Sequence, residues 1–464
     1  MSDLPKGWVV CKVGDVIQLG PRNVCDDEIE VGFVPLQRMG VRYREVHTFE
    51  VRKWAEVKSG YTHFKDGDVL LARITPSFEN GKAGIAQSLP NGIGAGSTEY
   101  IVCRPTEGAV SAELLLAHFK TQEFLTNGKQ LMSGAVGQQR VPKSYVESCE
   151  FPLAPFNEQK RIADKLDTLL SRVDACRERL DRVPAILKRF RQSILAAACS
   201  GQLTEEWRLL QGLEPTQEFP KTWSSCKIGD VGRVQLGRQR SPRFHAGDCM
   251  HPYLRVQNIF EDRIDLSDVM TMDFPGHDYE RYQLHPGDIL LNEGQSPQFL
   301  GRPALYRGEL PGVCFTNTLI RFQANANVYP EYALLVFRNH MHSGRYVTEG
   351  RITTNIAHLG AGRFAEVEFP LPPMDEQAEI IRRTEALLGH ADRFQACYTT
   401  VRSKVNRLTP SLLAKAFRGE LVPQDPNDEP ADELLARIRT TCESAVAKSP
   451  GKKAAGKLKV AKDT

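Results

Sequence analysis

Several signatures of common protein classes are missing from this sequence of 464 residues. No apolar run approaches the roughly 18 residues that a membrane-spanning helix needs. The first residues, MSDLPKGWVV, lack the basic start and apolar core of a secretory signal. The 11 cysteines contain no CxxC pair, which disfavours both a zinc site and a disulfide framework. These absences predict a cytoplasmic protein with reduced thiols and no membrane contact.

The motifs of DNA-modifying enzymes are missing as well. An amino-methyltransferase needs an Asn/Asp-Pro-Pro-aromatic loop, and none occurs. The segment GIGAG (92–96) neither follows a long strand nor opens a helix, so a turn is favoured over a cofactor loop. GKKAAGKL (451–458) has Leu458 where a phosphate-binding loop needs Ser or Thr. We therefore expect no catalytic residue, no metal and no cofactor in this chain.

The charge balance does not identify a partner. The formal net charge is +3, but residues 448–464 contribute +5 through six Lys and one Asp, so the rest of the chain carries −2. A DNA-binding face would therefore have to be local. The basic tail 448–464 is expected to be disordered.

The organising feature is a twofold internal repeat, and such repeats are best sought first. PKGWVVCKVGDV (5–16) returns as PKTWSSCKIGDV (220–231), and FKDGDVLL (64–71) returns as LHPGDILL (284–291). FPLAPFNEQKRI (151–162) returns as FPLPPMDEQAEI (369–380), within a match that runs without a gap over residues 151–204 and 369–422. Each half therefore has the same order, a variable globular part and then a constant helical part.

Each globular part is predicted to mix α and β structure. GDVLL and GDILL are typical of short buried strands, and residues 111–125 and 330–341 have the apolar spacing of amphipathic helices. The predicted fold class is α+β, with two mixed α/β domains in tandem and two long helices. The predicted boundaries are 1–153 for the first domain, 154–215 for the central helical region, 216–371 for the second domain, 372–447 for the distal helical region and 448–464 for the tail.

The constant parts have apolar residues at a 4-3-4-3 spacing, which is the heptad pattern of a coiled coil. Thr384 and Ala391 weaken the second copy. Pro184 is expected to kink the first helix, and Asn157 and Asp375 are expected to cap the two helices at their N-termini. The alternative is that each helix packs only on its own domain. The predicted interface residues are Ile162, Leu166, Leu169, Val173, Leu180, Leu187, Ile380, Leu387, Phe394, Tyr398, Val405 and Leu412.

This order of segments resembles the specificity subunit of type I restriction–modification enzymes. The resemblance is strongest in LKRFRQSILAAACSGQLTEEW (187–207), EQAEIIRRTEALL (376–388) and LTPSLLAKAFRGEL (408–421), and it covers about residues 4–440. It implies that the globular parts are target recognition domains that read the two parts of an asymmetric DNA site. It also implies an antiparallel coiled coil, two methyltransferase subunits with S-adenosylmethionine, and restriction subunits that use ATP and Mg.

Candidate DNA-binding residues lie in the diverged polar stretches after each GD[VI]LL strand and before each constant part. Phosphate and base contacts favour Arg, Lys, Asn, Gln, Ser and Thr. The candidates are Arg73, Thr75, Ser77, Asn80, Lys82, Gln138, Gln139 and Arg140 in the first half, and Asn292, Gln295, Gln298, Arg302, Arg351, Thr353 and Thr354 in the second. An ordinary solvated loop is the alternative for each residue. For the whole chain, the alternatives are a coiled-coil scaffold without DNA and a self-contained DNA-modifying enzyme.

Overall fold

The chain folds as two units, which a computed structural model describes for residues 4–213, 219–353 and 356–447. The first unit comprises residues 1–180 and 400–464, and the second comprises residues 181–399. No helix among the described residues is long and apolar enough to cross a membrane. The boundaries fall inside the two long helices, α5 (Phe156–Ser200) and α12 (Met374–Phe417), so each helix contributes to both units. The expected tail 448–464 lies outside the described residues.

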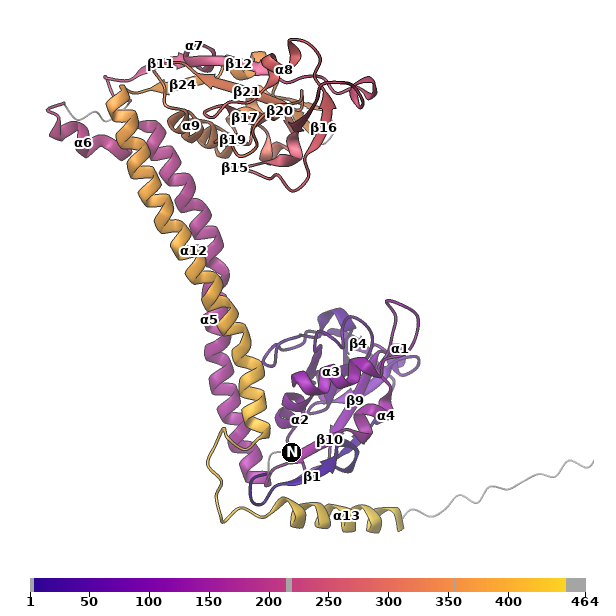
Figure 1. Ribbon diagram of the computed structural model, residues 1–464. Helices are drawn as coiled ribbons and strands as arrows, with labels where there is room; N and C mark the ends of the chain where they lie inside the picture. Colours follow the sequence, from indigo (N-terminus) through magenta and orange to yellow (C-terminus); the bar gives the residue numbers. More distant parts are fainter. Residues whose placement is uncertain (1–3, 214–218, 354–355, 448–464) are drawn as a thin grey trace, which may run out of the picture. The chain divides into compact units, whose positions relative to one another are not determined.

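The first unit contains two four-stranded sheets and a two-stranded ribbon (Figure 1). The first sheet has the order β2 (Ile17–Leu19), β9 (Tyr100–Pro105), β6 (Val69–Ala72), β7 (Ala83–Ile85). The second has the order β4 (Glu50–Lys53), β3 (Glu30–Val34), β8 (Ile93–Gly96), β5 (Thr62–Lys65). β1 (Val9–Lys12) pairs with β10 (Glu150–Leu153). The helices are α1 (Trp54–Val57), α2 (Ala112–Phe119), α3 (Gln122–Gln130), α4 (Lys143–Ser148) and, beyond α12, α13 (Ala431–Ala447).

The second unit repeats the first sheet as β12 (Gly232–Leu236), β21 (Leu319–Ala324), β17 (Ile289–Asn292), β19 (Pro303–Leu305). Two three-stranded sheets follow, β16 (Met270–Asp273), β13 (Met250–Leu254), β20 (Cys314–Phe315) and β18 (Gly294–Gln295), β23 (Ile356–His358), β22 (Arg351–Thr353). β14 (Ile259–Phe260) pairs with β15 (Arg263–Ile264), and β11 (Ser224–Lys227) pairs with β24 (Glu368–Leu371). The helices are α6 (Glu205–Leu210), α7 (Ile228–Val231), α8 (Asp278–Tyr282), α9 (Pro330–His342), α10 (Arg345–Glu349) and α11 (Ala361–Ala365).

These elements confirm the predicted α+β class and the tandem repeat. GDVLL and GDILL supply the equivalent strands β6 and β17. The prediction of one helix over 111–125 is wrong, because the chain forms α2 and α3 there. The side chain of Thr121 accepts a hydrogen bond from the N–H of Phe124, so it caps a new helix directly after the first has ended.

The twelve repeated residues fasten each long helix to its globular domain. In α5 the side-chain amide of Gln159 donates to the carbonyls of Ala109 and Ala154 and accepts from the N–H of Ser111. In α12, Gln377 donates to the carbonyls of Asn327 and Pro372 and accepts from the N–H of Tyr329. Both glutamines are fully buried. The motif recurs because each half satisfies the same buried backbone groups with the same amide.

The expected N-caps are wrong. α5 begins at Phe156 and α12 at Met374, so Asn157 and Asp375 already lie within the first turn of each helix. The glutamine two residues further on instead holds each helix start to the domain through the hydrogen bonds above. α5 also continues through Pro184 without ending.

The glutamate before each glutamine has a different environment in the two units. Glu158 accepts a hydrogen bond from the indole N–H of Trp8 at 3.0 Å, and Glu376 accepts the equivalent one from Trp223 at 2.8 Å. Glu376 also pairs with Arg208, and both side chains are buried. Glu158 has no such ion pair among the described residues, and burial raises its pKa above the ordinary value.

The Glu158 carboxyl predicts a pH dependence of stability in the first unit. Because its folded-state pKa lies above that of the unfolded chain, its favourable contribution is fully present below the unfolded pKa of about 4.3 and is lost as pH rises through the folded pKa. Glu158→Gln should remove this slope, since a glutamine keeps an acceptor for Trp8 and does not titrate. Urea unfolding between pH 4 and pH 7 tests this. An unchanged slope would show that Glu158 does not cause it.

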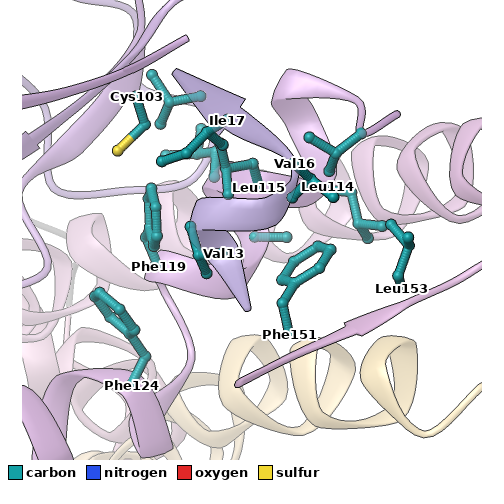
Figure 2. Close-up of a cluster of buried hydrophobic side chains, with 14 of the residues drawn as sticks. Val13, Val16, Ile17, Cys103, Leu114, Leu115, Phe119, Phe124, Phe151 and Leu153 are labelled. Carbon is teal, nitrogen blue, oxygen red and sulfur yellow. The ribbon is translucent and has the colours of Figure 1, made fainter. Parts of the chain in front are cut away.

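Each globular core is completed by the far end of the other repeat's helix. The first core contains Ile162 from the start of α5 together with Leu413 and Ala416 from the end of α12. The second core contains Ile380 from the start of α12 together with Leu195 and Ala198 from the end of α5. Figure 2 shows Phe151 of the first core next to a helix drawn in pale yellow, and the rings of Phe151 and Phe417 of α12 lie 6.0 Å apart. The alternative that each helix packs only on its own domain is therefore wrong.

Within the second unit, the segments of α5 and α12 run antiparallel. Arg191 pairs with Asp392 at 2.9 Å, while Arg383, nearer the start of α12, donates to the carbonyl of Leu203, just beyond the end of α5. In the first unit, Arg177 of α5 donates to the hydroxyl of Thr409 at 2.9 Å. Polar groups therefore border the apolar contact between the helices.

Only one apolar line per helix is buried along its whole length. The buried or half-buried residues on this line are Leu166, Val173, Leu180, Leu187 and Ile194 in α5, and Thr384, Ala391, Tyr398, Val405 and Leu412 at the equivalent positions in α12. On the other line, Ile162 and Ile380 are fully buried by the domains, and Leu169 and Leu387 are half-buried. Thr384 and Ala391, expected to weaken the seam, are fully buried within it.

The prediction that Phe394 lies in the interface is wrong, since its side chain is 65% exposed. A 3.6-residue helix drifts relative to a 3.5-residue pattern, so a sequence heptad does not keep both of its positions at one narrow contact. Leu408 on the same line of α12 is 44% exposed, and Phe190 on the corresponding line of α5 is 40% exposed. The helix pair therefore presents apolar side chains to solvent.

Candidate nucleic-acid interface

The two polar stretches predicted in the first half lie side by side in the first unit. Ile74 forms an antiparallel bridge with Arg140. The N–H and hydroxyl of Thr75 both donate to the carbonyl of Gln139, at 2.9 and 3.1 Å, and the N–H of Val141 donates to the carbonyl of Arg73. Residues distant in sequence therefore form one surface at the end of β6.

The stretch before the constant part is a short hairpin, residues 133–140, which we call the first finger. Ser133 and Arg140 exchange both backbone hydrogen bonds at its base, at 3.1 and 2.8 Å. Its tip is a turn in which the N–H of Gln138 donates to the carbonyl of Ala135 at 2.9 Å. Gly137 has φ 81°, a conformation that glycine adopts at little cost in such a turn.

Arg140 braces the first finger against the sheet. Its guanidinium donates to both carboxylate oxygens of Glu99, the residue before β9, at 2.7 to 3.1 Å. It also donates to the carbonyl of Gln138. Because this cation is already paired, Arg140 is a positioning residue for the finger rather than a free phosphate ligand.

The second unit builds the same arrangement from different side chains. β22 (Arg351–Thr353) and β23 (Ile356–His358) pair antiparallel, and we call these two strands the second finger. Gln295 pairs with Ala357 and Gly294 with His358, so this finger also runs beside the stretch that follows the GD[VI]LL strand. His358 lies 3.1 Å from Glu293. The structure thus places both predicted stretches together in each unit.

The candidate side chains differ in their exposure. Asn80, Gln138 and Gln298 are exposed, while Arg73, Thr75, Ser77, Gln139 and Gln295 are partly exposed. Thr354 lies outside the described residues. Arg351 and Thr353 belong to β22, and their side chains are not among those described. The exposed and partly exposed side chains form the candidate interface.

Three candidates are unsuited to direct contact with a base. Asn292 ends strand β17 and is fully buried, so its prediction as a DNA-binding residue is wrong. Lys82 donates to the carbonyl of Leu36 at 3.0 Å, which makes it a local brace. Arg302 lies between the rings of Phe260 and Phe299, 4.9 and 5.0 Å from their centroids, and burial lowers its pKa.

A basic and aromatic loop in the second unit was not among the predicted DNA-binding segments. Arg240 lies over the ring of Tyr253, and Arg243 lies over the ring of Phe244. Both arginines are exposed, and neither has a carboxylate partner among the described residues. The signal was the dense run GRQRSPRF (237–244), in which three arginines precede an aromatic residue. Such cations are suited to phosphate contacts.

We also searched the described residues for a metal-binding site. Among the described residues, no group of three or more His, Cys, Asp or Glu could hold a metal ion. The common features of the two units are instead a buried strand, a polar stretch after it and a finger beside that stretch.

Comparisons with known proteins identify this arrangement. The model of the family described as type I restriction modification DNA specificity domain matches residues 5–185 and 220–391, one match for each half. The EcoKI specificity subunit of Escherichia coli strain K12 is 30% identical, covering 74% of each chain. The EcoAI specificity subunit of Escherichia coli is 25% identical, covering 89% of this chain and 83% of the relative.

Solved structures give the same fold. The HsdS subunit from Thermoanaerobacter tengcongensis matches with a TM-score of 0.61 at 19% identity, covering 90% of this chain and 98% of that one. A chain from a study of complex assembly and conformational transition of the type I R-M system matches with a TM-score of 0.69 at 19% identity, covering 90% and 100%.

The chain belongs to the family of type I restriction–modification DNA specificity subunits. Its function is that of the family, recognition of the DNA target. The fingers and the stretches beside them are therefore the candidate elements for that recognition.

Proposed function

We propose that the chain reads an asymmetric DNA target in two parts, one with each unit, and that the chemistry resides in partner subunits. The observation that carries this proposal is one scaffold built twice with different recognition side chains. Ile74 and Arg140 in the first unit correspond to Gly294 and His358 in the second. Because the two units share one scaffold but carry different side chains on it, we expect them to recognise two different DNA half-sites. α5 and α12 would space them, because each helix contributes to both units.

Two methyltransferase subunits and restriction subunits are the proposed partners. S-adenosylmethionine would bind the methyltransferase, and ATP and Mg would bind the restriction subunit, so this chain would hold no cofactor and perform no catalysis. Exposed apolar side chains support a docking surface in the second unit. Those of α6 and the segment after it are Leu209, Leu210, Leu213 and Phe219. Solvent-exposed apolar groups of this kind mark protein contacts when they cluster.

Reconstitution with a methyltransferase partner tests the proposal. Genome-wide mapping of methylated sites should give one non-palindromic sequence in two parts separated by an unread spacer. The pure chain should transfer no labelled methyl group from S-adenosylmethionine. A contiguous or palindromic site would contradict the two-part reading, and methyl transfer by the chain alone would contradict the division of labour.

Arg73 gives a test of the loop assignment. The Nε of Arg73 is buried without a hydrogen-bond partner, and the side chain forms no ion pair among the described residues. Arg73→Ala should weaken DNA binding by about 1–3 kcal/mol. Loss of a guanine contact would relax one target position, whereas loss of a phosphate contact would lower the salt slope by about one. Lys53→Ala, which removes an exposed ion pair with Glu28, is the control and should change little. Equal effects of the two substitutions on DNA binding would show that the loop of Arg73 does not contact the DNA.

A further inference from the structure

The first finger carries an apolar side chain at its tip. Val136 is 99% exposed, and it follows Ala135 at the corner of the turn that Gln138 closes. Gly137, with φ 81°, occupies the next position of that turn. Val136 is therefore the largest apolar side chain at the tip, because the neighbouring tip residues are glycine, alanine and glutamine.

This tip is held in place by the contacts at the base of the finger. A Cβ atom added at Gly134 would lie 3.0 Å from the carbonyl oxygen of Gln138, so the backbone closes tightly on itself there. The base is fixed by the Ser133–Arg140 pair and by the ion pair between Arg140 and Glu99. The same hairpin is joined to Thr75. Val136 is thus presented beside the candidate DNA-binding residues.

The chemistry of a base-pair edge limits what such a side chain can recognise. A valine offers only methyl groups, and the apolar feature of the major-groove edges is the C5 methyl group of thymine. Gln138, two residues away, is exposed, and glutamine can make two hydrogen bonds to adenine. The two side chains together are better suited to contact an A·T base pair than a G·C base pair.

We propose that the first finger reads an A·T base pair in the first half-site, with the methyl groups of Val136 packed against the methyl group of the thymine. The proposal rests on the proposed function, in which the first unit reads one part of the target. It concerns the first unit alone.

Deoxyuridine substitution tests the contact, because deoxyuridine lacks only the thymine methyl group and keeps the base pair. The full chain with its methyltransferase partner would bind duplexes in which each thymine of the mapped target is replaced in turn. One replacement in the half-site read by the first unit should weaken binding about fourfold, the effect of one buried methyl group. Replacements in the other half-site should have no effect.

Val136→Ala supplies the second arm of a double-mutant cycle. The variant should bind the unmodified target less tightly, and the fourfold effect of deoxyuridine should vanish in it, because the two losses remove one contact. Val24→Ala is the matched control, since Val24 is 97% exposed in the same unit, and it should retain the full deoxyuridine effect. Thermal unfolding of each variant verifies its folding.

Several results would overturn the proposal. They are a half-site of G·C pairs only, binding that no deoxyuridine changes, or a deoxyuridine effect that persists in Val136→Ala. Equal weakening on all DNA sequences would indicate insertion between bases and would also overturn it. In each case methylation at a defined two-part site would leave the proposed function intact. Absence of sequence-specific methylation would overturn both.

Discussion

Replacing Glu376 by glutamine should destabilise the second unit by about 3–5 kcal/mol, because it leaves a buried guanidinium without its carboxylate. The Glu376 carboxylate accepts hydrogen bonds from Arg208, Thr204 and Trp223, and the side chains of Glu376 and Arg208 are 1% and 7% exposed. Glutamine could still accept from two of these donors, but it would not balance the charge of Arg208. Urea unfolding of the full chain, with hydrogen exchange to locate the change, measures the effect.

Glu158→Gln is the matched control from the other half of the repeat. Glu158 has an equivalent indole partner, Trp8. It has no counterpart of Arg208, since the equivalent position is Pro426. Its substitution at pH 7 should change the free energy of unfolding by about 1 kcal/mol or less, because a neutral hydrogen bond replaces a buried carboxylate. Equal destabilisation by both substitutions would show that the indole contact, rather than the ion pair, dominates. A small effect of Glu376→Gln would contradict the role assigned to Arg208.

Much of the fold could be predicted because the same sequence patterns occur in both halves of the repeat. The GD[VI]LL segments predicted strands β6 and β17, and the FPL-P-EQ segments predicted the starts of α5 and α12 to within about two residues. The family resemblance implied an antiparallel coiled coil, which brings the end of each helix to the other domain, but the residue pattern alone did not decide which core receives it. Leu195 and Leu413 have the same sequence context, so the pattern is equally compatible with packing on either domain. Tertiary contacts decide the matter.

The sequence singled out the stretches that form the candidate site, and their contact with DNA stays a prediction. That the two stretches of each half lie side by side was not predicted, because it depends on tertiary pairing between the strand end and the segment before the constant part. Burial of Asn292 could not be predicted, since a polar residue ending a strand is more often exposed. Arg240 and Arg243 could have been predicted from their arginine-rich run, but their loop has no matching arginine cluster in the first half, so the repeat does not indicate it.

The N-terminal half alone, residues 1 to about 215, should form a homodimer. The first core requires the end of a second helix, which α12 supplies through Leu413 and Ala416. The equivalent residues of α5 are Leu195 and Ala198, identical in type, so a second copy of the half-chain can supply the same side chains. Sedimentation should give a dimer at micromolar concentration. With the methyltransferase partner, it should direct methylation to an inverted repeat of the first half-site, since the two copies are related by a twofold axis.

The half-chain dimer lacks α13, whose Ala431, Leu434, Leu435 and Ile438 also belong to the first core, and it should have a further packing defect at the end of the exchanged helix. In the full chain, the ring of Phe417 lies 5.5 Å from His118 and 6.0 Å from Phe151. The half-chain offers Cys199 at the equivalent position, so this space loses most of its filling. Cys199→Phe should restore the ring and tighten the dimer about tenfold or more, because burying a phenylalanine side chain contributes about 1.5–3 kcal/mol.

The same substitution should have the opposite effect in the full chain. There Cys199 packs against the second core, and burial raises the pKa of its thiol to about 12. A phenylalanine at that position would overfill the core and cost about 1–3 kcal/mol. A gain in the half-chain together with a loss in the full chain would show that position 199 serves the second core in one case and the first core in the other. A half-chain that folds and remains monomeric would refute the exchange of helix ends. A dimer that Cys199→Phe does not tighten would place the helix ends elsewhere, because only the predicted packing brings residue 199 against Phe151.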